Sequence, residues 1–297
     1  MRVVFMGTPD ISATCLRRLV EEKFEVVGVY TKPDMPKNRG MKLVMSETKT
    51  YALSQDLPVY QPATFRDDAV VEELRALRPD VIAVVAYGKI LPQRVLDIPR
   101  LGCINIHASV LPELRGSGPV QWAILNGMEE TGVTAMYMAA EMDAGDIIEI
   151  RKTPIDPFEN AQSLLDRLAC DTLRAVEAGT ARRTPQDGTK ATFAPMLTKA
   201  LCPIDWTKTM RQITDHVRGL DPWPVATAEL AGTHFKIYSV RPTEKKSEKA
   251  PGTPVALTKR ALEVACGDGV LEVLELQADG GKRMRAPDYF RGHPIEL

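Results

Sequence analysis

A run of consecutive apolar residues, Val81-Ile-Ala-Val-Val-Ala86, constrains the fold of this chain more than any other feature of its sequence. A strand in the middle of a parallel sheet is buried on both faces, so it needs apolar side chains at every position. Similar short runs recur earlier and later, with longer amphipathic stretches between them (2–6, 25–30, 102–107). This alternation predicts an α/β fold with a doubly wound, Rossmann-like, mostly parallel sheet, in which 81–86 forms a central strand.

The first domain is expected to end in the second half of the chain. Beyond two β-rich runs at 133–138 and 146–152, residues 161–178 show a helical spacing of leucines, and a polar, turn-rich stretch follows them. We therefore predict that residues 1–179 form the first domain and that residues 180–203 form a linker.

Residues 204–297 have the pattern of a second, smaller domain. A helix is predicted over 206–218. After it, short strand-like runs alternate with breaks such as Asp221-Pro-Trp-Pro224 and Gly267-Asp-Gly269. Short strands with Gly- and Pro-rich turns are typical of a small β-barrel, and we expect an OB-like barrel here.

Composition and charge exclude several classes of protein. A formal net charge of −1 provides no global basic field for binding nucleic acid, so any polyanion must be held by local patches. The five cysteines are scattered without a C-x-x-C pair, which argues against a disulfide framework or a zinc site. The sequence contains neither a signal-peptide pattern nor an apolar run of membrane-spanning length. We therefore expect a cytoplasmic protein without a membrane partner.

Three polar residues are candidates for chemistry. Asn105 and His107 are two apart on a predicted strand, so both side chains leave the same face near its carboxyl end, where open α/β sheets bind ligands. Asp143 lies in a Gly-containing turn between two predicted strands, and its neighbour Asp146 is assigned a structural role. A neutral imidazole and an amide donor can steady the oxyanion of a tetrahedral intermediate, while a carboxylate takes the proton of an attacking amine. The trio therefore favours acyl transfer to an amine without a covalent intermediate.

A basic loop follows the second predicted strand. Its charged residues are Lys32, Lys37, Arg39 and Lys42 against Asp34 alone. Gly and Pro residues interrupt the segment, and such a loop can clamp phosphates.

These motifs occur together in one known family. The chain resembles the folate-dependent formyltransferases in five blocks (Asn105-Ile-His107, Ser109-Val-Leu-Pro112, Arg115-Gly-Ser-Gly-Pro-Val-Gln-Trp-Ala-Ile-Leu-Asn-Gly127, Thr131-Gly-Val-Thr134, Asp143-Ala-Gly-Asp-Ile147). The resemblance implies that Asn105, His107 and Asp143 are catalytic and that the formyl donor is 10-formyltetrahydrofolate. It also implies that the loop residues Ser109, Val110, Leu111 and Pro112 contact the folate, and that no metal takes part.

Further blocks resemble one branch of this family, whose acceptor is initiator methionyl-tRNA. They are Phe5-Met-Gly-Thr-Pro-Asp10, the loop Thr31–Leu43, Ile204-Asp-Trp206 and Arg218-Gly-Leu-Asp-Pro-Trp-Pro224. The resemblance implies that Arg39, with Lys32, Lys37 and Lys42, contacts the tRNA, that the C-terminal barrel helps to seat it, and that tetrahydrofolate is released. A monomer is expected.

Two alternatives stay open at this point. A formyltransferase acting on an amino sugar-nucleotide or an aminoribonucleotide would share the trio and the folate loop, although a small acceptor needs neither a second domain nor a basic loop. An RNA-binding module that has lost catalysis would not need all three polar residues.

Glu113 departs from the family pattern, which usually has a basic residue there. A carboxylate at this position repels anionic ligands.

Overall fold

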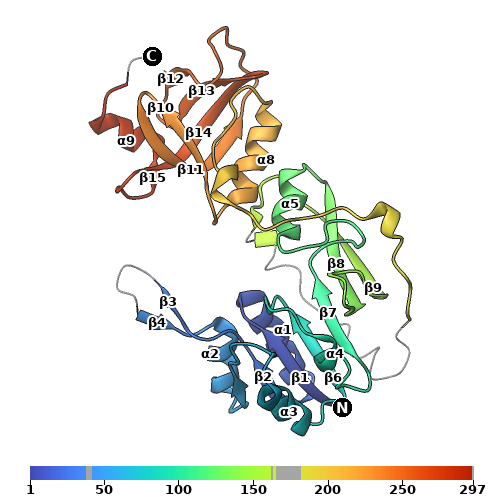
Figure 1. Cartoon of the computed structure of the whole chain (residues 1–297). Coiled ribbons are helices and arrows are strands. Elements are labelled where there is room, and N and C mark those ends of the chain that lie inside the picture. Colours follow the sequence, from blue (N-terminus) through green and yellow to red (C-terminus); the bar gives the residue numbers. More distant parts are fainter. Residues whose placement is uncertain (38–41, 162, 165–181, 296–297) are drawn as a thin grey trace. The chain divides into compact units, whose positions relative to one another are not determined.

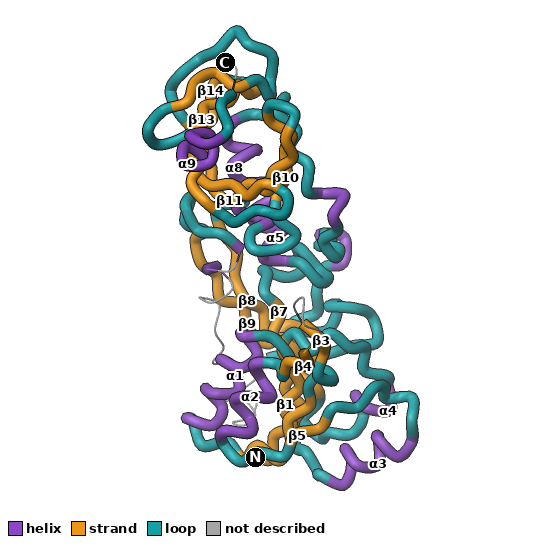
Figure 2. The backbone as a smooth tube through the Cα atoms, turned by 90° about the vertical axis from the view of Figure 1, so that its left-hand side faces the viewer, coloured by secondary structure: helices purple, strands orange, loops and turns teal. Residues whose placement is uncertain are grey.

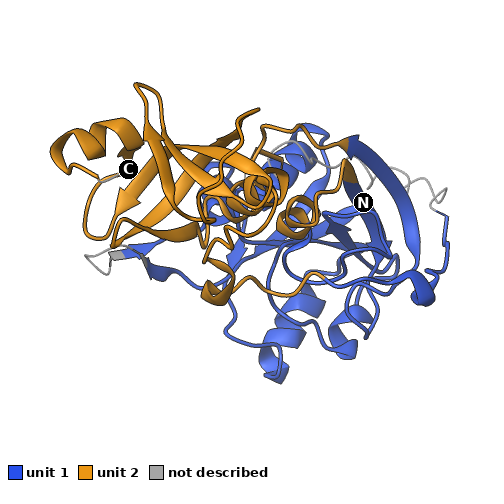
Figure 3. Ribbon diagram, turned by 90° about the horizontal axis from the view of Figure 1, so that it is seen from above, with its two compact units in different colours: residues 1–119, 132–153, 165–193 blue, residues 120–131, 154–164, 194–297 orange. Residues whose placement is uncertain are grey.

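A computed structural model of the chain describes residues 1–37, 42–161, 163–164 and 182–295. The described chain forms two compact units, coloured separately in Figure 3. Unit 1 contains 1–119, 132–153 and 165–193, and unit 2 contains 120–131, 154–164 and 194–297. Most of the helix predicted at 161–178 lies outside the described residues. No described helix is both long enough and apolar enough to cross a membrane.

Unit 1 is built on a seven-stranded sheet in the order β5-β2-β1-β6-β7-β8-β9. The strands from β5 to β7 are parallel, and β8 runs antiparallel to β7. This arrangement confirms the predicted doubly wound, mostly parallel sheet. The strands are β1 (Arg2–Gly7), β2 (Glu25–Tyr30), β5 (Val59–Tyr60), β6 (Val81–Val85), β7 (Cys103–His107), β8 (Glu130–Tyr137) and β9 (Ile147–Pro154).

The central strand is β6, as the apolar run predicts. It lies between β1 and β7, and all five of its side chains are buried. Alternate residues of the sheet serve two different cores, since Val81 and Ala83 belong to one apolar cluster and Ile82 and Val84 to the other. Successive side chains of the strand thus point to opposite faces of the sheet and pack into the apolar cluster on each face.

Helices cover both of these faces (Figures 1 and 2). Residues of α1 (Asp10–Glu21) and α2 (Glu47–Ser54) pack into the first cluster. Residues of α3 (Asp68–Ala76) and α4 (Gln93–Leu96) pack into the second. A separate two-stranded hairpin of β3 (Met35–Lys37) and β4 (Lys42–Val44) follows β2.

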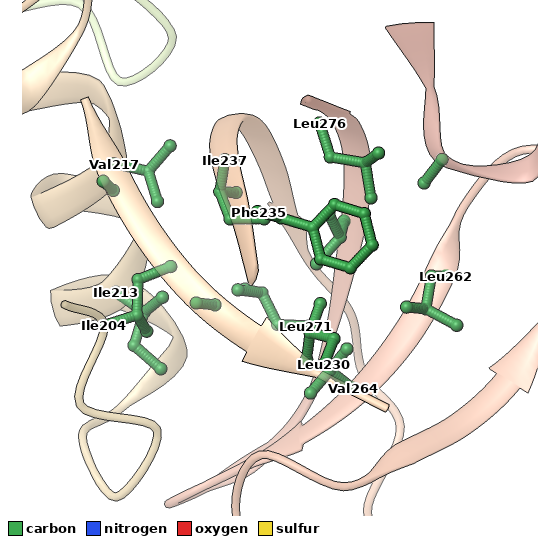
Figure 4. Close-up of a cluster of buried hydrophobic side chains, with 14 of the residues drawn as sticks. Ile204, Ile213, Val217, Leu230, Phe235, Ile237, Leu262, Val264, Leu271 and Leu276 are labelled. Carbon is green, nitrogen blue, oxygen red and sulfur yellow. The ribbon is translucent and has the colours of Figure 1, made fainter. Parts of the chain in front are cut away.

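Unit 2 contains the predicted C-terminal β domain, which is confirmed as a separate antiparallel sheet. Its strand order is β10-β11-β14-β13-β12, with β15 beside β14. Phe235, fully buried, lies among aliphatic side chains of the sheet and of α8 (Figure 4). The elements are α5 (Pro119–Leu125), α8 (Met210–Leu220), β10 (Ala226–Leu230), β11 (Thr233–Pro242), β12 (Pro254–Leu257), β13 (Leu262–Cys266), β14 (Gly269–Ala278), β15 (Met284–Arg285) and α9 (Ala286–Gly292).

Helix α8 begins later than the residue 206 that its sequence pattern predicts. Asp205 instead accepts hydrogen bonds from the backbone and hydroxyl of Thr207, which forms a turn. Thr209 and Gln212 then form a reciprocal capping box that starts the helix at Met210.

Candidate functional site

The site is built at the carboxyl end of β7. Asn105 and His107 leave the same face of this strand, and the neighbouring β8 pairs with it through Met136 and Thr134. The His107 side chain is 6% exposed and Asn105 is half-buried. The expected placement of two polar side chains at a ligand-binding sheet edge is therefore present.

The turn after β8 brings Asp143 to these two residues. The Asp143 Oδ2 atom lies 3.6 Å from His107 Nδ1, and its Oδ1 atom accepts from Asn105 Nδ2 at 3.4 Å. The Asp143 side chain is 13% exposed, so the carboxylate faces the other two polar groups rather than bulk water. The structure thus gathers all three residues that sequence places in the trio.

Backbone groups of the loop after β7 complete the arrangement. The Gly116 amide donates to Asp143 Oδ2 at 2.8 Å, and the carbonyl oxygen of Leu114 lies 2.9 Å from His107 Nε2. Because a carbonyl only accepts, the His107 Nε2 carries the hydrogen of this bond. The ring orientation is thereby fixed, and Nδ1 is the nitrogen that faces Asp143. Sequence reasoning missed both contacts because main-chain groups leave no residue-type signal.

The predicted folate loop, Ser109–Pro112, is held from beneath by Thr134. The Thr134 hydroxyl donates to the Ser109 carbonyl at 2.7 Å and accepts from the Leu111 amide at 3.1 Å. Ser109 and Leu111 are buried, and the Ser109 hydroxyl donates to the Glu113 carbonyl at 2.6 Å. Only the side chains of Val110 and Pro112 are partly exposed. In this structure the loop therefore offers a ligand two apolar side chains and backbone groups.

A nucleophilic cysteine is not available on this strand. Cys103 is buried, and desolvation raises the pKa of its thiol to about 12. The thiol therefore stays protonated at neutral pH, and a thiolate is the form that attacks. This observation favours direct transfer over a covalent cysteine intermediate. Among the residues that the structure describes, no cluster of three or more His, Cys, Asp or Glu side chains is arranged to hold a metal ion.

The structure places three of the four predicted tRNA-contacting residues, and they lie in different settings. Lys37 and Lys42 pair across the β3–β4 hairpin, whereas Arg39 lies outside the described residues. Lys32 precedes the hairpin, and its ammonium lies against Gly88, where a Cβ atom would come within 2.4 Å of it. Lys32 therefore lies near the carboxyl ends of β2 and β6.

The base of the hairpin is anchored by a small polar network. Lys49 Nζ donates to Asp34 Oδ2 at 2.6 Å and to Gln61 Oε1 at 2.8 Å. Gln61 Nε2 donates to Asp34 Oδ1 at 2.9 Å and to the Lys32 carbonyl at 2.8 Å. The hydrogen bond from Lys49, followed by that from Gln61, holds the pKa of the Asp34 carboxyl below its usual range. Sequence reasoning counted Asp34 only as an opposing charge and missed this anchor.

Comparison with known protein families identifies relatives of this chain. The formyl transferase family model matches residues 1–176, and the model of the formyl transferase C-terminal domain matches residues 196–294. The chain belongs to the formyl transferase family.

Several methionyl-tRNA formyltransferases match the chain along its whole length. The methionyl-tRNA formyltransferase of Clostridioides difficile is 42% identical, with 100% of this chain and 98% of that protein covered. The methionyl-tRNA formyltransferase of Geotalea uraniireducens is 44% identical over 99% of this chain and 96% of its own length. Among solved structures, HypX from Aquifex aeolicus in complex with tetrahydrofolic acid superposes with a TM-score of 0.68 at 20% identity. That match covers 99% of this chain but 48% of HypX, so it supports the fold alone.

Proposed function

We propose that the protein transfers the formyl group of 10-formyltetrahydrofolate to the α-amine of methionine on initiator methionyl-tRNA. The observation that carries this proposal is the convergence of Asn105, His107 and Asp143 within hydrogen-bonding or ion-pairing range at the end of β7. The full-length similarity to two methionyl-tRNA formyltransferases supports the choice of acceptor.

The reaction needs no covalent enzyme intermediate. The amine nitrogen attacks the formyl carbon, and the carbonyl electron pair moves to oxygen to give a tetrahedral intermediate. Asp143 accepts the proton that the nitrogen sheds. Collapse of the intermediate breaks the bond to N10 of the folate, which takes up a proton and leaves as tetrahydrofolate. Asn105 and His107 stabilise the oxyanion, the role that preorganised donors fill in acyl transfer.

His107 acts in this scheme as an imidazolium ion. Its Nε2–H is directed at the Leu114 carbonyl, so a neutral ring presents a lone pair at Nδ1 and has no second hydrogen to donate. Only the charged ring offers Nδ1–H to the developing oxyanion. The Asp143 carboxylate, 3.6 Å away, balances that charge. This assignment differs from the neutral imidazole considered from the sequence.

Acceptor binding is assigned to the basic hairpin and the C-terminal domain. Lys37 and Lys42 of the hairpin, Arg39 from the sequence between them, and Lys32 would neutralise phosphates near the acceptor end of the tRNA, while Val110 and Pro112 would line the folate side. Phosphate contacts position a nucleic acid without reading its sequence, which suits a loop that must place one amine.

The test is a choice of acceptors. The protein is incubated with 10-formyltetrahydrofolate and, in separate reactions, methionyl-tRNA, a UDP-amino sugar and glycinamide ribonucleotide, and the products are identified by mass spectrometry. Formylation of methionyl-tRNA alone is expected, and it should require His107. Formylation of a small acceptor in preference to methionyl-tRNA would overturn the assigned substrate, and no formylation in any reaction would overturn the assigned activity.

A further inference from the structure

One segment contacts both loops of the candidate site. This segment, residues 182–193, is here called the strap and belongs to unit 1. At one end Thr184 exchanges backbone hydrogen bonds of 2.8 and 3.0 Å with Ile147, directly after the turn that carries Asp143. At the other end the Thr192 hydroxyl accepts from the Leu114 amide at 2.8 Å, and its carbonyl accepts from the Arg115 amide at 2.9 Å. The strap therefore joins the Asp143 turn to the loop after β7.

Gln186 lies between these two attachment points. Most of the strap is exposed, but the Gln186 side chain is half-buried and directed at the turn. Its Nε2 donates to the carbonyls of Asp143 and Gly145, both at 2.8 Å. These two acceptors are two residues apart in the turn, so one amide group fixes the path of the backbone between them.

The Asp143 backbone needs such support. Its φ of 52° lies in the left-handed region, which costs a non-glycine residue energy and persists only where the surroundings enforce it. Gly145 packs so closely on β8 that a Cβ atom there would lie 1.7 Å from the Tyr137 carbonyl oxygen. The turn thus packs closely on β8 at Gly145, and the carbonyls of Asp143 and Gly145 accept hydrogen bonds from Gln186.

Arg115 determines which way the Gln186 amide points. The Arg115 side chain is buried, and its Nε and Nη2 atoms donate to Gln186 Oε1 at 3.2 and 2.8 Å. Because a guanidinium only donates, the amide oxygen must face Arg115 and the NH₂ group must face the turn. The next residue, Gly116, donates its amide to the Asp143 carboxylate. Arg115 and Gly116, which are neighbours in the chain, therefore hold Asp143 in two ways: Arg115 through Gln186 and the Asp143 carbonyl, and Gly116 through the Asp143 carboxylate.

We propose that Gln186, oriented by Arg115, is a positioning residue that holds Asp143 at the distance from His107 needed for formyl transfer. This inference rests on the proposed function in that Asp143 must take part in the reaction. The hydrogen bonds of Gln186 go to Arg115, to Met136 Sδ and to two main-chain carbonyls of the turn, so it acts on Asp143 through the backbone.

The test uses Gln186→Glu and Gln186→Ala. The first keeps the shape and the acceptor for Arg115 but replaces the NH₂ donor with a carboxylate oxygen, and the second removes the side chain. Both should lower kcat about 100-fold, the cost of a small misplacement of a reacting group, while KM for the folate changes less than about twofold. Gln55→Ala is the control, because Gln55 is exposed and its side-chain amide donates to the neighbouring Ser54. Thermal unfolding of each variant shows whether it is folded.

The decisive measurement repeats Gln186→Glu in an Asp143→Asn background, in single turnovers at excess enzyme. A residue that acts through Asp143 should cost less than about threefold there, since residues that act as a unit are not additive. The same factor in both backgrounds, or an unchanged kcat in the single variants, would overturn the positioning role. The assay uses whichever acceptor the wild type formylates, so failure of methionyl-tRNA as acceptor counts against the proposed function and leaves the Gln186 inference to be judged separately.

Discussion

The trio and the basic hairpin belong to the same α/β unit, but the structure holds them in different ways. Asp143 receives hydrogen bonds on both carboxylate oxygens, and the Gln186 side chain donates to two main-chain carbonyls of its turn. The β3–β4 hairpin is paired over three residues on each strand and anchored at its base, and its side chains Met35 and Leu43 are 62% and 70% exposed.

This difference matches the two tasks that the proposal assigns. A chemical step needs groups fixed to a fraction of an ångström, and buried, mutually hydrogen-bonded groups meet that need. A hairpin that binds a polyanion works through charge, which acts over several ångströms and tolerates variation in position. Substitutions in the trio should therefore affect kcat, and those in the hairpin should affect KM for tRNA.

Asp143→Asn should produce the largest loss of activity. It is the strongest test of the distinction between trio residues that set kcat and hairpin residues that set KM for tRNA. The amide keeps the size of the side chain but cannot accept the amine proton as a carboxylate does, so kcat should fall about 1,000-fold or more. Affinity for tetrahydrofolate, measured by titration calorimetry, should stay within about threefold of wild type. Asp146→Asn is the matched control in the same turn, because Asp146 is paired only loosely with Arg183 at 3.8 Å. Near-normal turnover by Asp143→Asn would remove it from the chemistry.

Arg39→Ala should show the opposite pattern. Loss of one phosphate contact should raise KM for methionyl-tRNA about tenfold and leave both kcat and folate affinity close to wild type. The dependence of log(kcat/KM) on log[salt] should also become shallower by about one unit, as expected when one counterion fewer is released. Equal losses toward tRNA and folate would show that the hairpin serves both sites, and the contrast would fail.

The Asp34 anchor tests whether the hairpin needs a fixed base. Asp34→Asn removes the charge that pairs with Lys49 in a partly buried contact, where the two side chains are 24% and 16% exposed, so the base of the hairpin should loosen and KM for tRNA should rise about threefold. The pKa of Asp34 is lowered in the folded protein, so its stabilising contribution is complete above the unfolded pKa of about 3.9 and is lost as pH falls through the lower folded value. At pH 7 and at pH 5.5 the variant should therefore show the same defect relative to wild type. Glu72→Gln, which breaks an exposed pair with Arg75 in α3, is the control. A defect that differed clearly between the two pH values would contradict the ionised Asp34 assumed here.

Sequence predicts much of this fold because local patterns carry the information. The continuous run at 81–86 predicts the central strand, observed over 81–85, and the spacing of Asn105 and His107 predicts two side chains on one face. Resemblance adds Asp143, which a Gly-containing turn alone does not distinguish from Asp146. The structure then brings these three side chains together from elements far apart in the sequence.

The supports of the site are not visible in the same way. Gly116 and Leu114 act through main-chain atoms, which any residue type supplies. Gln186 lies in a polar, turn-rich stretch whose composition predicts a linker, and only the tertiary fold shows that its amide reaches the Asp143 turn. The start of α8 at Met210 depends on a capping box that a pattern of apolar residues does not report.

Glu113→Gln should have the smallest effect and sharpens the comparison at the folate loop. The Glu113 side chain is exposed, while its backbone is held by Val110 and Ser109, so the substitution changes charge without changing the loop. A unit charge about 8 Å from an anion in water contributes about 0.5 kcal/mol, equivalent to roughly twofold in affinity. KM for the anionic substrate that passes nearest to Glu113 should therefore fall about twofold at low salt and return to the wild-type value at high salt, where the Debye length is shorter. Measuring KM for 10-formyltetrahydrofolate and for methionyl-tRNA in parallel identifies that substrate. A change in kcat instead would mean that the charge of Glu113 affects the trio. The distinction between residues that set kcat and charged residues that set KM would then not hold for this loop.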